Sequence, residues 1–316
     1  MYKIVIDTLG SDKGPSEILA GAKLVLEENP NVHLVIVGDE ELIKGSDLPL
    51  DRVEIIHATS TVTNYDSPVE AFYRKEPVSV FEALKYAGKD DDVIGVIAAG
   101  NTGALLVGSI KFLLDEKRTR PCMAAILPTI TGGFTCLVDT GATIDCNSQQ
   151  LIDFAHLGSD FMKKLYKIDA PRVALLSNGA EPTKGNKLVK ETHKLLASDT
   201  SINFVGNVEG NKTLAGLCDV LVCDGFAGNQ VLKNSEGMAM NLITEIVKYG
   251  KKTGNAAAME IVGYLMKRFD FESLGAGIML GTRKLVMKCR GSSGASAIRS
   301  AAHILINLAE NKTLYE

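Results

Sequence analysis

The sequence predicts a doubly wound α/β fold, in which helices cover both faces of a mixed, largely parallel sheet in three layers. Short apolar runs rich in β-branched residues recur along the chain, and most are followed by a turn and then by helical periodicity. These runs are apolar at successive positions, so both faces of each strand are expected to be buried, as in a sheet covered by helices.

Six of these runs are expected to form the interior strands, and they span residues 3–7, 32–38, 92–100, 122–128, 172–177 and 219–224. A second apolar run follows 122–128 across Gly132 and Gly133, which predicts a β-hairpin and therefore a mixed sheet. Another strand end is expected at INFVG, residues 202–206.

Helical periodicity appears after several strands, in residues 16–29, 102–116, 149–166 and 185–197. The first helix is expected to begin near Pro15, because proline is favoured at the first helical position. For Asp7 and Asp12, capping of this helix is the alternative to a role in a functional site.

A longer helical pattern, a short break and a second pattern predict a helical hairpin at about 229–268, projecting from the sheet layers. Lys248, Lys251 and Lys252 lie near its tip among Leu, Ile, Val and Met residues. Two roles are open: packing on the protein's own body or a partner copy, or contact with a membrane surface, for which apolar residues beside lysines are suited.

Length and composition set the scale of the molecule. With 316 residues, 46% hydrophobic and 23% charged, the chain can bury a large core as one large or two modest α/β domains, and we expect a single domain over 1–316. The formal net charge of −4 argues against a dedicated nucleic-acid binder, which needs clustered basic residues in excess.

Cysteine and histidine usage indicates a reduced, cytoplasmic protein without a bound transition metal. The six cysteines form no CxxC pair, and the five histidines form no HxxxH or HExxH array. Cys218 and Cys223 are expected to be core residues. No targeting segment is expected, and no apolar stretch is long enough to cross a bilayer. The phosphate-binding loop motif GxxxxGK[ST] is absent, and no GxGxxG motif follows the first strand, so no cofactor is expected.

Glycine, asparagine and charged residues gather just after five of the strands. Ligands of open α/β sheets bind beyond the carboxyl ends of strands, where glycines admit an anion and helix N-termini attract it. Each junction alone is also ordinary turn and capping chemistry. Together they predict a site for a small anion, formed by Asp7, Gly10, Asp12, Gly100, Gly103, Asn178, Gly185, Asn186, Asn207, Glu209, Gly225 and Gly228.

Eight stretches resemble, in order, the motif set of the bacterial phosphate acyltransferases (the PlsX enzymes), which are acyl-[acyl-carrier-protein]:phosphate acyltransferases. The stretches are IDTLGSDKGP, AAGNTGALL, ILPT, VDTGATIDC, KGNKLVKE, INFVGNVEG, VCDGFAGNQVLKNSEG and RGSSGASA. The resemblance runs from about residue 2 to residue 310.

This resemblance implies a fold similar to phosphotransacetylases and isocitrate dehydrogenases. It implies a homodimer that transfers a fatty acyl group from an acyl-carrier-protein thioester to inorganic phosphate, giving acyl-phosphate for phospholipid synthesis, without a cofactor. The hairpin matches a family segment that packs at the dimer and is linked to membrane association.

Phosphorolysis of a thioester needs a place for a phosphate dianion and donors for the developing oxyanion, each donor being worth about 10²–10³ in rate. Asn101, Thr102 and Asn229 are expected to be donors at the reacting centre. Lys184 and Lys233 are expected to be cations for phosphate, with a solvated helix face as the alternative. Asp224 is expected to orient a lysine or to receive a proton.

The chain departs from the family pattern at three places. It has Gly10-Ser11-Asp12 where the family has Gly-Gly-Asp, and Arg290-Gly291-Ser292-Ser293 where the family has His-Gly-Ser-Ser. The acidic position after Asn178-Gly179 is shifted to Glu181. Arg290 and Ser292 are expected to bind the anion, because a permanent guanidinium charge strengthens anion binding while it removes a proton carrier.

Three other functions stay open at this point. In the first, the acyl donor is a coenzyme A thioester instead of a carrier-protein thioester. In the second, the chain is a subunit of a larger acyl-transfer complex. In the third, it is a diverged protein that binds an anion without turnover. Arg290 in place of the family histidine favours the last of these.

Overall fold

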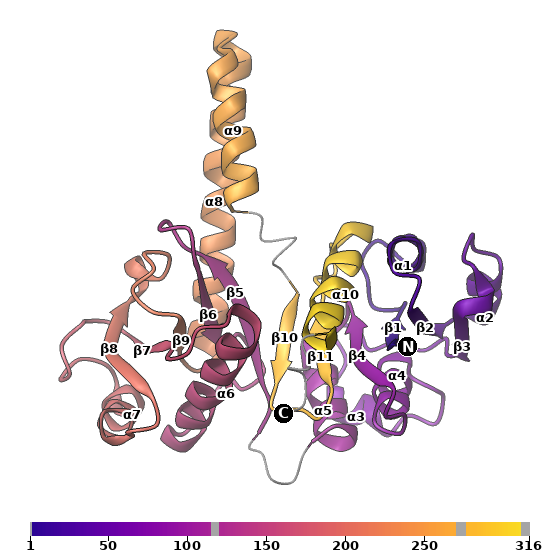
Figure 1. The fold of residues 1–316 in the computed structure, drawn as a ribbon, viewed down its shortest axis with the longest axis horizontal. Helices are drawn as coiled ribbons and strands as arrows, with labels where there is room; N and C mark the ends of the chain where they lie inside the picture. Colours follow the sequence, from indigo (N-terminus) through magenta and orange to yellow (C-terminus); the bar gives the residue numbers. More distant parts are fainter. Residues whose placement is uncertain (1, 115–119, 270–275, 311–316) are drawn as a thin grey trace. The chain divides into compact units, whose positions relative to one another are not determined.

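The structure is a computed structural model that describes residues 2–114, 120–269 and 276–310. The chain divides into two compact units, which are described separately (Figure 1). Unit 1 contains Met1–Ala124, Lys163–Ile168 and Ala276–Glu316, and unit 2 contains Ala125–Met162 and Asp169–Gly275. The single domain over 1–316 stays a prediction.

Unit 1 is built on a mixed sheet with the strand order β3-β2-β1-β4-β11-β10-β5. The first five are parallel, whereas β10 is antiparallel to both β11 and β5. The strands are β1 (Tyr2–Asp7), β2 (Val32–Gly38), β3 (Val53–His57), β4 (Val93–Ala98), β5 (Cys122–Pro128), β10 (Gly277–Leu280) and β11 (Leu285–Lys288). β5 continues into unit 2 after Ala124.

Helices cover both faces of the unit 1 sheet (Figure 1). One face carries α1 (Pro15–Glu28) and α10 (Ala295–Glu310), which pack so closely that a side chain at Gly21 would lie 2.6 Å from Ile298 Cβ. The other face carries α3 (Pro68–Phe72), α4 (Ser79–Ala87) and α5 (Thr102–Phe112). The short α2 (Glu40–Lys44) and the 3₁₀ turn η1 (Leu50–Arg52) flank β2 and β3.

Unit 2 has the strand order β5-β6-β9-β7-β8, and β6, β9, β7 and β8 are parallel. These strands are β6 (Phe134–Val138), β7 (Arg172–Ser177), β8 (Asn203–Glu209) and β9 (Val220–Val222). On one side lie α6 (Ser148–Tyr166) and α7 (Lys187–Ser198), with Gly158 of α6 directly over Val220. The 3₁₀ turn η2 (Gly210–Lys212) follows β8.

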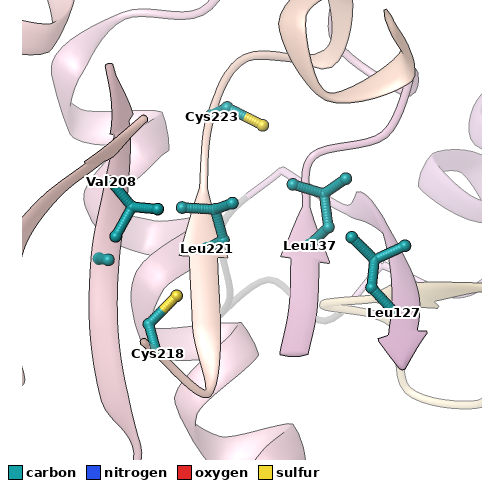
Figure 2. Close-up of a cluster of buried hydrophobic side chains, with 7 residues drawn as sticks. Leu127, Leu137, Val208, Cys218, Leu221 and Cys223 are labelled. Atoms are coloured by element: carbon teal, nitrogen blue, oxygen red, sulfur yellow. The ribbon is translucent and has the colours of Figure 1, made fainter. Parts of the chain in front are cut away.

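The core on the other side of this sheet is a cluster of buried side chains from neighbouring strands (Figure 2). Leu127, Leu137 and Leu221 lie side by side, and Cys218 and Cys223 fill the same layer. Burial raises the pKa of the Cys218 thiol to about 12. Both cysteines are therefore core residues, as predicted.

The helix α8 (Gly225–Thr253) covers this core with its first turns and then continues beyond the strands beside α9 (Ala256–Arg268) (Figure 1). Gly254 ends α8 with a left-handed φ of 66°. Asn255 caps α9, its side chain accepting the Ala257 N–H at 3.0 Å. A left-handed glycine followed by an asparagine cap gives the chain a tight reversal between two helices.

The predicted fold class and the six predicted strands are confirmed, as is the start of the first helix at Pro15. The expectation that Asp7 or Asp12 caps this helix is wrong, because Gly14 is the N-cap residue and no side chain caps it. The predicted helix at 102–116 ends earlier, at Phe112, and residues 115 and 116 lie outside the described residues.

Candidate functional site

A polar cavity of about 430 Å³ lies in unit 1, beyond the carboxyl ends of β1, β4 and β11. It is lined by three segments, residues 10–12, 61–65 and 99–102, and by Lys288 and Gly291. Residues predicted from separate parts of the sequence meet here: Gly10, Asp12 and Gly100, predicted to bind the anion, and Asn101 and Thr102, predicted to be donors at the reacting centre. The parallel strands β1 and β4 bring them together because they are neighbours in the sheet.

Close backbone contacts shape this cavity. Gly10 has a left-handed φ of 87°, and a Cβ there would lie 2.9 Å from the Gly100 Cα. The Asp12 N–H donates to the Gly291 carbonyl at 2.8 Å, and a side chain at Gly291 would run into the Asp12 carboxylate. These glycines let the loops after β1, β4 and β11 approach one another without intervening side chains.

The N-terminus of α5 lies at the cavity, where helix N–H groups and the helix dipole favour an anion. Asn101 is the N-cap residue: its Oδ1 accepts the Ala104 N–H and its Nδ2 donates to the Thr63 carbonyl, both at 3.0 Å. Gly103 was expected to face the anion, but a Cβ there would lie 2.7 Å from Pro68. Its role is therefore close packing of α5.

The wall at 61–65 is held by two charged residues behind it. Asp66 accepts from the Thr63 N–H at 2.7 Å and from its hydroxyl at 2.6 Å, while Arg74 pairs with Asp66 and donates to the Thr61 carbonyl at 3.0 Å. The hydrogen bonds from Thr63, together with Arg74, lower the pKa of Asp66. This wall was not predicted, because the segment has no strand or helix pattern in the sequence.

Lys288 supplies a cation to the cavity. This lysine was not among the predicted site residues. It is half-buried at the end of β11 and pairs in register with Ala98 of β4. Two described residues just after it, Arg290 and Ser292, do not line the cavity. The Arg290 N–H donates to the Ser293 hydroxyl at 3.1 Å, so Ser293 shapes this turn.

Asp7 lies at the end of β1 and is only 1% exposed. Its Oδ1 accepts the Leu9 N–H at 3.0 Å, which ties the carboxylate to the start of the loop that lines the cavity. Burial raises the pKa of Asp7 to about 7. The residue supports this loop from inside the core rather than lining the cavity itself.

A second group of predicted residues lies toward the ends of β7 and β8 in unit 2. The strand end predicted at 202–206 is wrong, because β8 continues to Glu209 and Asn207 lies within it. The Asn178 side chain accepts the Gly185 N–H at 2.8 Å, and Asn186 caps α7 by accepting the Val189 N–H at 2.9 Å. Asn207 donates to the Glu181 carbonyl at 3.0 Å and lies 2.9 Å from the ring nitrogen of His193. These bonds hold the loop between β7 and α7.

Two charged residues of this group have different surroundings. Lys184 is exposed, and its stem lies over Gly179, where a Cβ would be 2.6 Å from the Lys184 Cγ. Glu209 is half-buried at the end of β8, in register with Ser177.

The third group lies where β9 joins α8, and here the local roles differ from those predicted. Asp224 caps α8, accepting the Ala227 N–H at 2.7 Å. Gly225 donates its N–H to the Thr143 carbonyl at 2.8 Å, and a side chain at Gly228 would run into the Asp139 carbonyl. Both glycines therefore allow α8 to pack closely against the loop at 139–143, and the Gly225 N–H is already bonded within the protein.

Asn229 and Lys233 follow on the next turns of α8. Asn229 is half-buried beside Gly141, where a Cβ would lie 3.8 Å from the Asn229 Cβ. Lys233 is exposed, and its Nζ lies 3.7 Å from Glu236 Oε2. The surroundings of Lys233 therefore match the alternative role, that of a residue on a solvated helix face.

The side chains and helices of the described residues bear on metal binding and on membrane spanning. Within residues 2–114, 120–269 and 276–310, no group of three or more His, Cys, Asp or Glu side chains is arranged to hold a metal ion. In the same ranges, no helix combines the length and the apolar character needed to span a bilayer.

Comparison with known proteins identifies the family. The model of a family described as "Fatty acid synthesis protein" matches residues 2–314. The phosphate acyltransferase of Thermoanaerobacter pseudethanolicus is 35% identical over 319 residues, covering 99% of this chain and 95% of the relative. The chain belongs to this family of phosphate acyltransferases. It is therefore an acyltransferase.

A further phosphate acyltransferase is similar in sequence, and solved structures are similar in fold. The phosphate acyltransferase of Streptococcus pneumoniae is 38% identical over 308 residues, covering 95% of this chain and 93% of the relative. A phosphotransacetylase from Streptococcus pyogenes has a similar fold, with a TM-score of 0.62, 15% identity and coverage of 98% and 94%. A branched-chain phosphotransacylase from Enterococcus faecalis gives 0.60 at 15% identity, with full coverage of both chains.

Proposed function

We propose that this phosphate acyltransferase transfers a fatty acyl group from an acyl-carrier-protein thioester to inorganic phosphate, and that the acyl-phosphate enters phospholipid synthesis. The family supports acyl transfer to phosphate. The polar cavity of unit 1 carries the proposal further, because it combines a helix N-terminus, a lysine and close-packed glycine loops, which together favour a small anion over a nucleotide.

In the proposed reaction, phosphate binds at the N-terminus of α5 with Lys288 and the Thr102 hydroxyl beside it. One phosphate oxygen attacks the thioester carbonyl carbon, and the resulting tetrahedral intermediate collapses by breaking the C–S bond. The phosphate proton leaves with the carrier thiolate, which gives a free thiol and acyl-phosphate. Holding phosphate against the carbonyl supplies much of the acceleration, since phosphate is already a competent nucleophile.

Asn101 has a positioning role in this proposal. Its amide ties the N-terminus of α5 to Thr63, and so fixes the cavity wall relative to the helix N–H groups. Asn229 of unit 2 remains a proposed donor to the developing oxyanion. Lys184 and Lys233, also of unit 2, remain the alternative proposed cations for phosphate, in place of Lys288. The part proposed for Asp224 as a proton acceptor is weakened by its hydrogen bond to the Ala227 N–H.

A hydroxamate trap tests the proposed function. The purified protein is incubated with phosphate, hydroxylamine and either a palmitoyl carrier-protein thioester or palmitoyl-coenzyme A. Phosphate-dependent hydroxamate formation from the carrier thioester, at a rate well above that from coenzyme A, is the expected result. A preference for coenzyme A would assign the other donor, and the absence of phosphate-dependent product with both donors would overturn the proposal.

Replacing Lys288 with methionine is expected to raise the KM for phosphate by about tenfold or more, because a charge-assisted contact to the anion is lost. The change keeps most of the apolar stem, so β11 should fold normally. Phosphate titration of the variant measures the effect, and Lys89→Met, at an exposed position of unit 1, is the control. An unchanged KM for phosphate in K288M would place the anion elsewhere.

We also propose that the protein is cytoplasmic, forms a homodimer, and contacts membranes peripherally through the hairpin of α8 and α9. Large apolar side chains exposed on the hairpin support this: Met238, Met240, Leu242, Tyr249, Met259, Ile261, Tyr264 and Met266. Reversing the charge of Lys251 and Lys252 should weaken binding to anionic vesicles in a salt-dependent way, by about 1 kcal/mol for each lysine. Unchanged vesicle binding would leave packing as the hairpin's role.

A further inference from the structure

A second cavity of unit 1, of about 520 Å³, runs along one side of α1. One wall is formed by Pro15, Leu19, Ala20 and Lys23 of α1, and the other by Leu42 of α2 and Leu48 after it. We call this cavity the α1–α2 groove. Its walls are mainly apolar, and its volume lies in the range of small-molecule pockets.

The groove is open to a ligand along its length. Leu42 is 55% exposed although it is a large apolar residue, and Ala20 is exposed on the opposite wall. Pro15, Leu19 and Lys23 follow each other at i, i+4 spacing, so they form a straight stripe about 12 Å long. A largely apolar wall of this length suits an extended hydrocarbon chain.

The segment 10–16 connects this groove to the polar cavity. Gly10, Ser11 and Asp12 line the polar cavity, and Pro15 and Ser16 line the groove, so one short stretch of chain contributes to both cavities. At Gly14, between them, a Cβ would meet no atom within 4 Å. A molecule with an anionic head and an apolar tail matches this pair of cavities.

The far end of the groove is polar. Lys23 of α1 forms an ion pair with Asp47, which follows α2, and its Nζ also lies 3.9 Å from Glu27 Oε1. This pair joins the two walls two helical turns from Pro15. A hydrocarbon chain that extends past this point meets charged groups, which it cannot desolvate without cost.

We propose that the α1–α2 groove binds the fatty acyl chain of the substrate and of the acyl-phosphate product, with the reacting carboxyl end at the polar cavity. This inference rests on the proposed function. The groove thereby becomes the element that selects long acyl chains over short ones, and the Lys23–Asp47 pair marks its end.

Binding can be tested by fluorescence, without turnover. The chain contains no tryptophan, so one introduced tryptophan is the only indole fluorophore. Leu42→Trp places a single fluorophore on the groove wall, and Leu195→Trp places one on α7 of unit 2 as the matched control. Palmitate that carries a nitroxide quencher on its hydrocarbon chain is added at concentrations below its critical micelle concentration. Saturable quenching of L42W that exceeds quenching of L195W is expected, and equal quenching of the two variants would overturn the inference.

The second experiment fills the groove and uses activity as its readout. Ala20→Phe should lower turnover of a palmitoyl donor by about tenfold or more, since several methylene groups lose their apolar contacts, and should leave a butyryl donor unaffected. Ala197→Phe, at an exposed alanine of α7, is the control. An equal effect on both donors, or no effect, would overturn the inference. A wild-type protein inactive with every donor would instead overturn the proposed function.

Discussion

Replacing Asp7 with asparagine is expected to change how the free energy of unfolding depends on pH. The pKa of this buried carboxyl is raised from 3.8 to about 7, so the folded state favours its protonated form. The stabilisation that this protonated carboxyl gives is fully present below 3.8, the pKa of the group in the unfolded chain. It is lost as the pH rises to the folded-state pKa of about 7. The loss between pH 4 and 8 should reach up to about 4 kcal/mol in the wild type.

The measurement is a series of urea unfolding curves between pH 4 and pH 8, and Asp7→Asn should show a flatter dependence than the wild type. Asp51→Asn removes the same charge from an exposed position and serves as the control, because it should follow the wild-type curve. If Asp7→Asn and the wild type lose stability in parallel as the pH rises, Asp7 is not the group that titrates.

Replacing Asn229 with alanine is expected to lower turnover by about 10²-fold or more while leaving the melting temperature nearly unchanged. A donor that acts on the oxyanion in the transition state contributes little to folding. The alternative role for an asparagine near the start of a helix is that of a helix cap. The structure removes that alternative, because α8 begins at Gly225 and is capped by Asp224.

Turnover and thermal unfolding of Asn229→Ala are measured together with those of Asn234→Ala, an exposed asparagine of the same helix. The control should keep both properties. If Asn229→Ala loses stability and activity in proportion, its contact with the loop at Gly141 is structural and the catalytic role is wrong.

Most of the strands predicted from the sequence are buried on both faces, and the exception is β8, an edge strand that is partly exposed. Strands buried on both faces give a continuous apolar run, as at β4, where every residue is buried. β3 is an edge strand with only part of each face covered, and β10 and β11 have four residues each, too few for a clear pattern. Lys288 was missed for the same reason, since it is recognisable as a strand-end residue only once β11 is known.

The candidate site was predictable only in part, because the same residue type serves different purposes at different strand-to-helix junctions. Gly10, Gly100 and Asn101 do line the polar cavity, but Gly103, Gly225 and Gly228 allow close packing against other segments. A glycine in a strand-to-helix junction serves either purpose. Only the position of a neighbouring segment, such as the loop at 139–143, decides between them, and this position depends on contacts far apart in the sequence.

The place of β11 in unit 1 has a consequence for biosynthesis. This strand pairs with β4 along Gly95–Ala98, and α10, which follows it, packs on α1. While a ribosome is still making unit 2, the nascent chain already contains β4 but not its partner, and the unpaired edge of a Val- and Ile-rich strand readily joins other chains. The newly made protein should therefore depend on chaperones or rapid completion of synthesis until residues 285–310 emerge.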